Sequence, residues 1–156
     1  MNGQEASFDD DISEYLDYNG TLKQYEFAYD QLMTMMVGTY PKKEGNSQEW
    51  TFLEKNKGKA VVEMKTALIT VYKMHFAKGD IKKMLAFYKS ESGKLLVSDR
   101  SKMTEMHKEE LSRFYNSAVG QKIIAKKDIL TEEISKASEL WSRDLYETFV
   151  SVLNNG

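Results

Sequence analysis

Apolar residues recur at three- and four-residue steps along nearly the whole chain, and only one proline, Pro41, interrupts them. This spacing places apolar side chains on one face of an α-helix, and it differs from the alternation typical of β-strands. It predicts helices over about residues 8–18, 22–39, 47–53 and 59–76, with Asn56 and Gly58 closing the third. The sequence therefore predicts an all-α fold, a multi-helix bundle.

The length of the chain, 156 residues of which 41% are hydrophobic, suits one core without disulfides, and the sequence contains no cysteine. We expect a single all-α domain over residues 1–156, with residues 1–7 as a flexible leader. The most hydrophobic run, residues 67–72, is far shorter than the roughly 20 residues of a membrane-spanning helix. Because the first residues lack the features of a secretory signal, two alternatives stay open: a cytosolic protein, or one whose signal has been removed.

Charge is segregated along the chain, although the net charge is only −2. Residues 1–50 carry three basic and ten acidic side chains, residues 51–127 carry 17 and eight, and residues 128–156 carry two and six. Either the basic middle faces an anionic partner, or the acidic ends pack beside it. We favour the second interpretation, because most of these lysines fall on predicted solvent faces.

A segment of 23 residues occurs twice, at residues 84–106 and 111–133, which are offset by 27 positions. Such self-similarity indicates a duplicated structural unit, here a corner between two helices. The identical pairs are Phe87 and Phe114, Tyr88 and Tyr115, Ser90 and Ser117, Gly93 and Gly120, Thr104 and Thr131, and Glu105 and Glu132.

The repeated F-Y-x-S-x-x-G core predicts how each corner is built. Ser90 is expected to cap the next helix by accepting a hydrogen bond from an amide of its first turn. Gly93, without a side chain, lets that helix approach the ring of Phe87 or Tyr88. Ser117 repeats this arrangement with its own glycine.

Two long helices should follow these corners. The helix after Ser90 is expected to reach Tyr115, and the helix after Ser117 is expected to run toward Leu153. Within the second helix, Asp128 and Thr131 are candidate interior caps.

The F-Y-x-S-x-x-G motif, preceded by H-F-A-K-G-D-I at residues 75–81, resembles the bacterial family catalogued as domain of unknown function 2059. The resemblance covers about residues 68–106, and it implies an α-helical fold, export to the periplasm or beyond the cell, and no assigned activity. The family commonly has proline after the serine, where this chain has Glu91 and Ala118. It also favours Ser or Thr as the cap before its aromatic helix, where this chain leaves Asp80 to supply the contact.

Motifs that would carry enzymatic chemistry are missing from the sequence. The di-iron, zinc-protease and nucleophile-elbow patterns do not occur. His75 and His107 could share a metal with Asp80 or Glu110, but such histidines are more often packed or solvated. We therefore expect no enzymatic activity, no cofactor and no metal.

Three functional hypotheses remain. The leading one is a non-catalytic helical domain, exported to the bacterial envelope, that acts through protein contacts; a homo-oligomer stays open. The alternative is a carrier or sensor that holds a small apolar or amphiphilic ligand between the corner helices, lined by Met84, Phe87, Met103 and Phe114. Binding of nucleic acid or anionic headgroups is not favoured; its candidate residues are Lys82, Lys83, Lys89, Lys94, Arg100 and Lys102.

Overall fold

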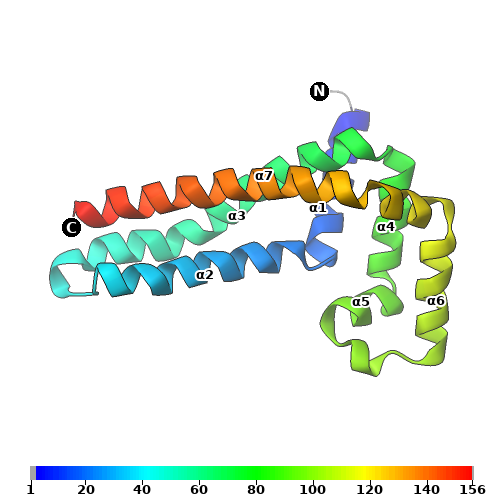
Figure 1. Ribbon diagram of the computed structural model, residues 1–156, viewed down its shortest axis with the longest axis horizontal. Helices are drawn as coiled ribbons and strands as arrows, with labels where there is room; N and C mark the ends of the chain where they lie inside the picture. The colour runs from blue at the N-terminus through cyan, green and yellow to red at the C-terminus, as the bar shows by residue number, and fades with distance from the viewer. Residues whose placement is uncertain (1–2, 156) are drawn as a thin grey trace. The chain divides into compact units, whose positions relative to one another are not determined.

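A computed structural model describes residues 3–155, and side chains from Ser7 onward. Within these residues the chain forms seven α-helices and two short 3-10 helices (Figure 1), which confirms the all-α prediction. The helices are α1 (Gly3–Tyr18), α2 (Thr21–Thr39), η1 (Glu44–Asn46), α3 (Ser47–His75), α4 (Lys78–Lys89), α5 (Glu91–Ser98), η2 (Arg100–Lys102), α6 (Glu105–Asn116) and α7 (Ala118–Asn154).

The contacts between residues divide the chain into two compact units. Unit 1 comprises residues 1–21 and 68–134, and unit 2 comprises residues 22–67 and 135–156, so that α3 and α7 contribute to both. The assignment of one domain to residues 1–156 stays a prediction. Of the expected leader, residues 1–2 lie outside the described residues, and the helix α1 begins at Gly3.

Unit 1 is built around the packing of α1 against α4, followed by α5 and α6. Ile12 and Leu16 of α1 and Ile81 and Met84 of α4 are fully buried, because the three- and four-residue steps place them on facing stripes. The turn between α1 and α2 uses Gly20, whose φ of +82° lies in the left-handed region that favours glycine. The predicted end of the first helix at about residue 18 is confirmed.

Acidic side chains of α1 pair with basic side chains elsewhere in unit 1. Asp9 lies 2.9 Å from the amine of Lys73, and Glu14 lies 2.7 Å from that of Lys89. A third pair, between Asp11 and Lys82, is 3.1 Å long. These pairs agree with the interpretation that an acidic end packs beside the basic middle, although exposed pairs add little to stability.

Unit 2 consists of α2, the first part of α3 and the last part of α7, which run side by side (Figure 1). The hydroxyl of Tyr29 donates to the carbonyl of Leu53 at 2.5 Å, and its ring meets Phe149 edge to face at 5.2 Å. The indole of Trp141 donates to the carbonyl of Ala60 at 2.8 Å. The buried polar ends of Tyr29 and Trp141 are thus satisfied by backbone carbonyls of α3, which ties α2 and α7 to that helix.

The prediction that a short helix closes at Asn56 and Gly58 is wrong. The helix α3 runs without a break for 29 residues, from Ser47 to His75. Trp50, Leu53 and Met64 are buried in one continuous stripe on both sides of the expected break. Burial of such side chains outweighs the cost of a helical glycine, about 1 kcal/mol.

Two further boundaries differ from the sequence prediction. The helix after Ser90 stops at Ser98 and does not reach Tyr115, because the Asp99 carboxylate accepts the backbone N–H of Ser101 at 3.1 Å and forms a turn. The helix after Ser117 does run to Asn154, without an interruption. The proposed interior caps at residues 128 and 131 are wrong, since both residues are exposed on a continuous helix.

Candidate functional site

Both predicted corners lie in unit 1, and both are capped by their serine. The amide of Gly93 donates to Ser90 Oγ at 3.2 Å, and the amide of Gly120 donates to Ser117 Oγ at the same distance. Each serine hydroxyl in turn donates to the carbonyl of the phenylalanine three residues earlier. The serines thus join the end of one helix to the start of the next, as predicted.

The two glycines permit close contact, but with backbone atoms and not with the rings that the sequence suggested. A Cβ atom at Gly93 would lie 2.5 Å from the Cα atom of Tyr88 and would overlap the carbonyl oxygen of Phe87. At Gly120 the added atom would lie 2.5 Å from the Cα atom of Tyr115. The expectation about the rings is corrected accordingly, and the corners serve helix packing.

The four residues proposed to line a ligand site are close-packed where the structure brings them together. The rings of Phe87 and Phe114 stack at 4.3 Å between centroids, with an interplanar angle of 9°, which leaves no room for a ligand between them. Met84 is fully buried and Met103 is half-buried. The pockets described below are lined by residues of unit 2 and not by these four residues. A ligand site at the corners stays a prediction.

Tyrosines surround the first corner. The ring of Tyr15 meets those of Tyr72 and Tyr88 edge to face, at 5.5 and 5.6 Å. Burial, and after it the neighbouring tyrosines, raises the pKa of the Tyr15 and Tyr88 hydroxyls. The Tyr15 and Tyr88 hydroxyls therefore stay protonated at neutral pH, as expected of phenols packed in a core.

The two histidines have separate partners. His75 Nε2 lies 2.7 Å from a carboxylate oxygen of Glu133, whereas His107 Nδ1 accepts the backbone N–H of Thr104 at 3.0 Å and helps to cap α6. Glu110 accepts a hydrogen bond from the buried Ser92. Within the part of the chain that the structure describes, no group of three or more potential ligands is placed to hold a metal ion.

Asp80 supplies the contact predicted at the start of α4. Its carboxylate accepts the backbone N–H of Ala77 at 2.9 Å and the amine of Lys122 at 2.6 Å. Partial burial opposes its ionisation, but these two hydrogen bonds outweigh burial and hold the pKa of Asp80 below its usual value. The role of this residue is therefore to hold the first turn of α4 and the first part of α7 together.

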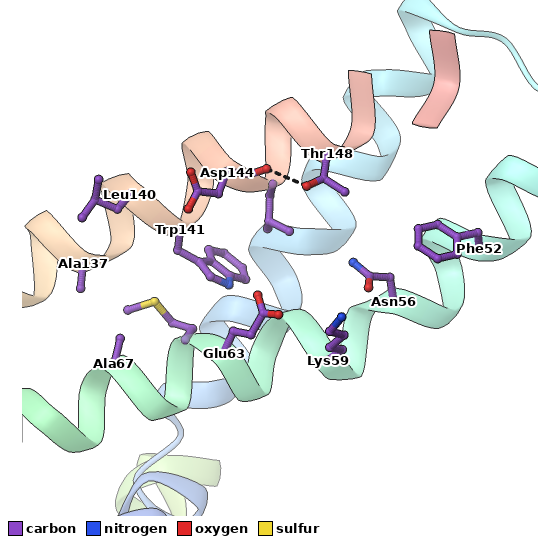
Figure 2. A pocket seen from close by; sticks show the side chains of 12 residues that line it. Phe52, Asn56, Lys59, Glu63, Ala67, Ala137, Leu140, Trp141, Asp144 and Thr148 are labelled. Carbon is purple, nitrogen blue, oxygen red and sulfur yellow. Dashed lines mark hydrogen bonds between the residues drawn. The ribbon is translucent and has the colours of Figure 1, made fainter. Parts of the chain in front are cut away.

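A groove between α3 and α7 in unit 2 is the candidate site that the sequence did not predict (Figure 2). Its main pocket has a volume of about 430 Å³. Met64, Trp141 and Leu145 are buried side chains of this pocket, while Phe52 and Leu140 are each 52% exposed. Large apolar side chains left half in water beside a hollow of this size are typical of a binding surface.

Two further hollows, both shallow, adjoin the main pocket toward the end of α7, and the second of them is lined by α7 alone. One, of about 320 Å³, shares Phe52 with the main pocket and reaches Gln48 and Asn155. The other, of about 410 Å³, shares Asp144 and Thr148 with the main pocket and reaches Val152. The groove, here meaning the three hollows together, therefore follows α3 from residue 48 to residue 67.

The charged side chains of the groove are mostly acidic. Glu49, Glu63, Asp144 and Glu147 line it, against one basic side chain, Lys59. Within the described residues these four carboxylates form no ion pair, in contrast to those of α1. We call these four carboxylates the acidic rim.

In the described part of the chain, no helix is both long and apolar enough to cross a membrane.

The sequence profile of a family described as "uncharacterized protein conserved in bacteria", domain of unknown function 2059, matches residues 62–109. The match includes all of α4 and α5 and the first serine corner, and it ends before the second. No curated protein and no solved structure matches the chain. The chain is thus confirmed as similar to this bacterial family over somewhat less than a third of its length, and the description of that family names no activity.

Proposed function

We propose that the chain is a non-catalytic helical domain that acts by contacting another protein, through the groove between α3 and α7 of unit 2. The observation that carries this proposal is the exposure of Phe52 and Leu140 beside a pocket with a buried apolar floor. Covering such side chains removes apolar surface from water, which favours association by about 25 cal/mol per Å². The loss of translational, rotational and side-chain freedom on binding offsets part of this gain.

The motif residues support a non-catalytic role. Ser90 and Ser117 engage their hydroxyls in helix caps, and Gly93 and Gly120 are buried against backbone atoms of the preceding helix. A nucleophilic serine donates its proton to a general base, whereas these two hydroxyls donate to backbone carbonyl oxygens. We therefore propose that the two duplicated corners serve helix packing and that the chain has no enzymatic activity.

Export to the bacterial envelope is the second part, and it rests on the family resemblance alone. Fractionation of the bacterium that encodes the chain, followed by detection with an antibody, tests it directly. We expect the protein in the periplasmic or secreted fraction. Recovery with cytoplasmic markers only would contradict this part and leave the contact function standing.

The contact function is tested by placing a photo-crosslinking amino acid, benzoylphenylalanine, at position 140 in living cells. The matched control places it at position 27 on α2, where Phe27 is 64% exposed in the same unit and does not line the groove. We expect a discrete protein adduct from position 140 and a much weaker one from position 27. Equal adducts from both positions, or none from position 140, would contradict the proposed function.

A further inference from the structure

The shape of the groove indicates what kind of partner it takes. Along α3 it extends from residue 48 to residue 67, a stretch of about 30 Å at the rise of an α-helix. A compact small molecule would fill the main pocket and leave the adjoining hollows empty. An element that lies along α3 and α7 for five turns is required to cover the whole groove, and an α-helix has that length and width.

The apolar side chains of the groove are spaced for such a helix. Phe52 lies toward one end of the main pocket and Leu140 toward the other (Figure 2). Trp141 lies between them in the buried floor of the pocket, where its indole nitrogen donates to the carbonyl of Ala60. A helix with apolar residues at i, i+3, i+4 and i+7 would bury Phe52 and Leu140 along one of its faces and contact this floor between them.

The acidic rim indicates the charge of the partner. Four carboxylates and one amine leave the groove with an excess of three negative charges. Since these carboxylates have no ion-pair partner among the described residues, covering them with an acidic or neutral segment would remove water without replacing it by a counter-charge. Lysine or arginine at the edges of the docking helix would supply that counter-charge.

We propose that the groove binds one basic amphipathic helix of a partner protein, which packs along α3 and α7 as a fourth helix of unit 2. This inference rests on the proposed contact function and names the chemistry of the partner. Apolar contact with Phe52, Trp141 and Leu140 provides the affinity, and the acidic rim provides the preference for basic sequences.

The test measures binding of two synthetic peptides of about 20 residues, the length of the groove, to the full chain by calorimetry. Both peptides carry leucine at i, i+3, i+4 and i+7; one has lysine at all other positions and the other has glutamate. We expect the lysine peptide to bind at least about tenfold more tightly than the glutamate peptide, because several exposed ion pairs each raise the affinity by about threefold. Its affinity should fall when the salt concentration rises from about 50 to about 500 mM.

Variants of the chain locate the binding. The double variant Glu63→Gln, Asp144→Asn should weaken binding of the lysine peptide by about threefold to tenfold. The matched control, Glu26→Gln with Glu139→Gln, removes the same charge from exposed positions of unit 2 outside the groove and should leave the affinity unchanged. A second double variant, Phe52→Ser with Leu140→Ser, changes half-exposed side chains, and circular dichroism verifies its folding; it should weaken both peptides.

Five outcomes would overturn the inference. These are failure of both peptides to bind, equal binding of the glutamate peptide, equal loss in the control variant, unchanged binding by the Phe52→Ser, Leu140→Ser variant, and sedimentation showing a dimer that Leu140→Ser dissociates. The last outcome would assign the groove to a second copy of the chain. If the peptides fail while position 140 still cross-links in cells, the basic-helix inference falls and the contact function stands. If position 140 gives no cross-link, the contact function itself falls.

Discussion

Replacing Gly93 by alanine tests the packing of the first corner most directly. The new Cβ atom would lie 2.5 Å from the Cα atom of Tyr88, about 1 Å closer than carbon atoms approach in proteins. It would also overlap the carbonyl oxygen of Phe87. Both obstacles are backbone atoms, so no side chain can rotate away, and α5 must shift as a whole relative to α4.

The expected magnitude is the difference of two effects. Overpacking of a rigid contact costs about 3 kcal/mol, the upper end of the usual range, because the backbone of two helices has to move. Alanine returns about 1 kcal/mol through its higher helix propensity. We therefore expect Gly93→Ala to lower the free energy of unfolding by about 2 kcal/mol, which corresponds to about 4–8 °C in Tm for a chain of this size.

The assay is urea denaturation followed by circular dichroism, with amide hydrogen exchange to locate the effect. Exchange should accelerate in α4 and α5. The control is Gly58→Ala, since a Cβ atom at Gly58 of α3 meets nothing within 4 Å; it should raise stability by up to about 1 kcal/mol. If Gly93→Ala is as stable as the unaltered chain, or if Gly58→Ala loses as much, the close approach inferred at the corner is wrong.

Three further predictions concern unit 1. Ser117→Ala removes the cap of α7 and should cost about 1 kcal/mol in urea denaturation, whereas Ser117→Asp, which keeps a capping oxygen, should lose less. Asp80→Asn breaks the contact with Lys122 and should cost about 0.5 kcal/mol at neutral pH, a small value because the lysine is exposed. The pKa of Asp80 is lowered on folding, so its contribution is present above the ordinary value of 3.8 and is lost as the pH falls below it; the variant and the unaltered chain should then converge in acid denaturation. Absorbance titration should show Tyr15 and Tyr88 ionising only well above pH 10. Because folding raises their pKa, the contribution of these two tyrosines to stability should be constant below about pH 10 and fall above it. Ionisation of all tyrosines together near pH 10 in the folded chain would contradict their burial.

The serine corners were predictable because their chemistry is local. A serine three residues before a glycine, after two aromatic residues, specifies a cap and a close contact whatever packs around it. Even here the sequence suggested the wrong surface, since Gly93 meets the backbone of Phe87 and Tyr88 and not their rings. The glycine indicates that other atoms approach closely at this position, but only the three-dimensional path of the chain shows which atoms these are.

Helix lengths were less predictable, for two different reasons. At Gly58 the local cost of glycine is visible in the sequence, but the compensating burial of Trp50 and Met64 depends on helices that pack from elsewhere in the chain. At Asp99 the signal was present: an aspartate two residues before a serine favours a turn, and Thr104 can cap a new helix. The apolar periodicity of residues 91–115 masked both.

The groove could not be predicted from the periodicity of apolar residues, because it depends on which apolar helix faces pack against one another. Trp141 lies on an apolar face of α7 that the sequence would assign to the core, and it does pack against Tyr25 of α2 and the backbone of α3. Three helices cannot enclose every apolar side chain that such stripes provide, so Phe52 and Leu140 remain half in water. The same residue pattern that folds unit 2 therefore leaves an incomplete fourth position, and the carboxylates around it, which folding does not neutralise, make that position selective for charge.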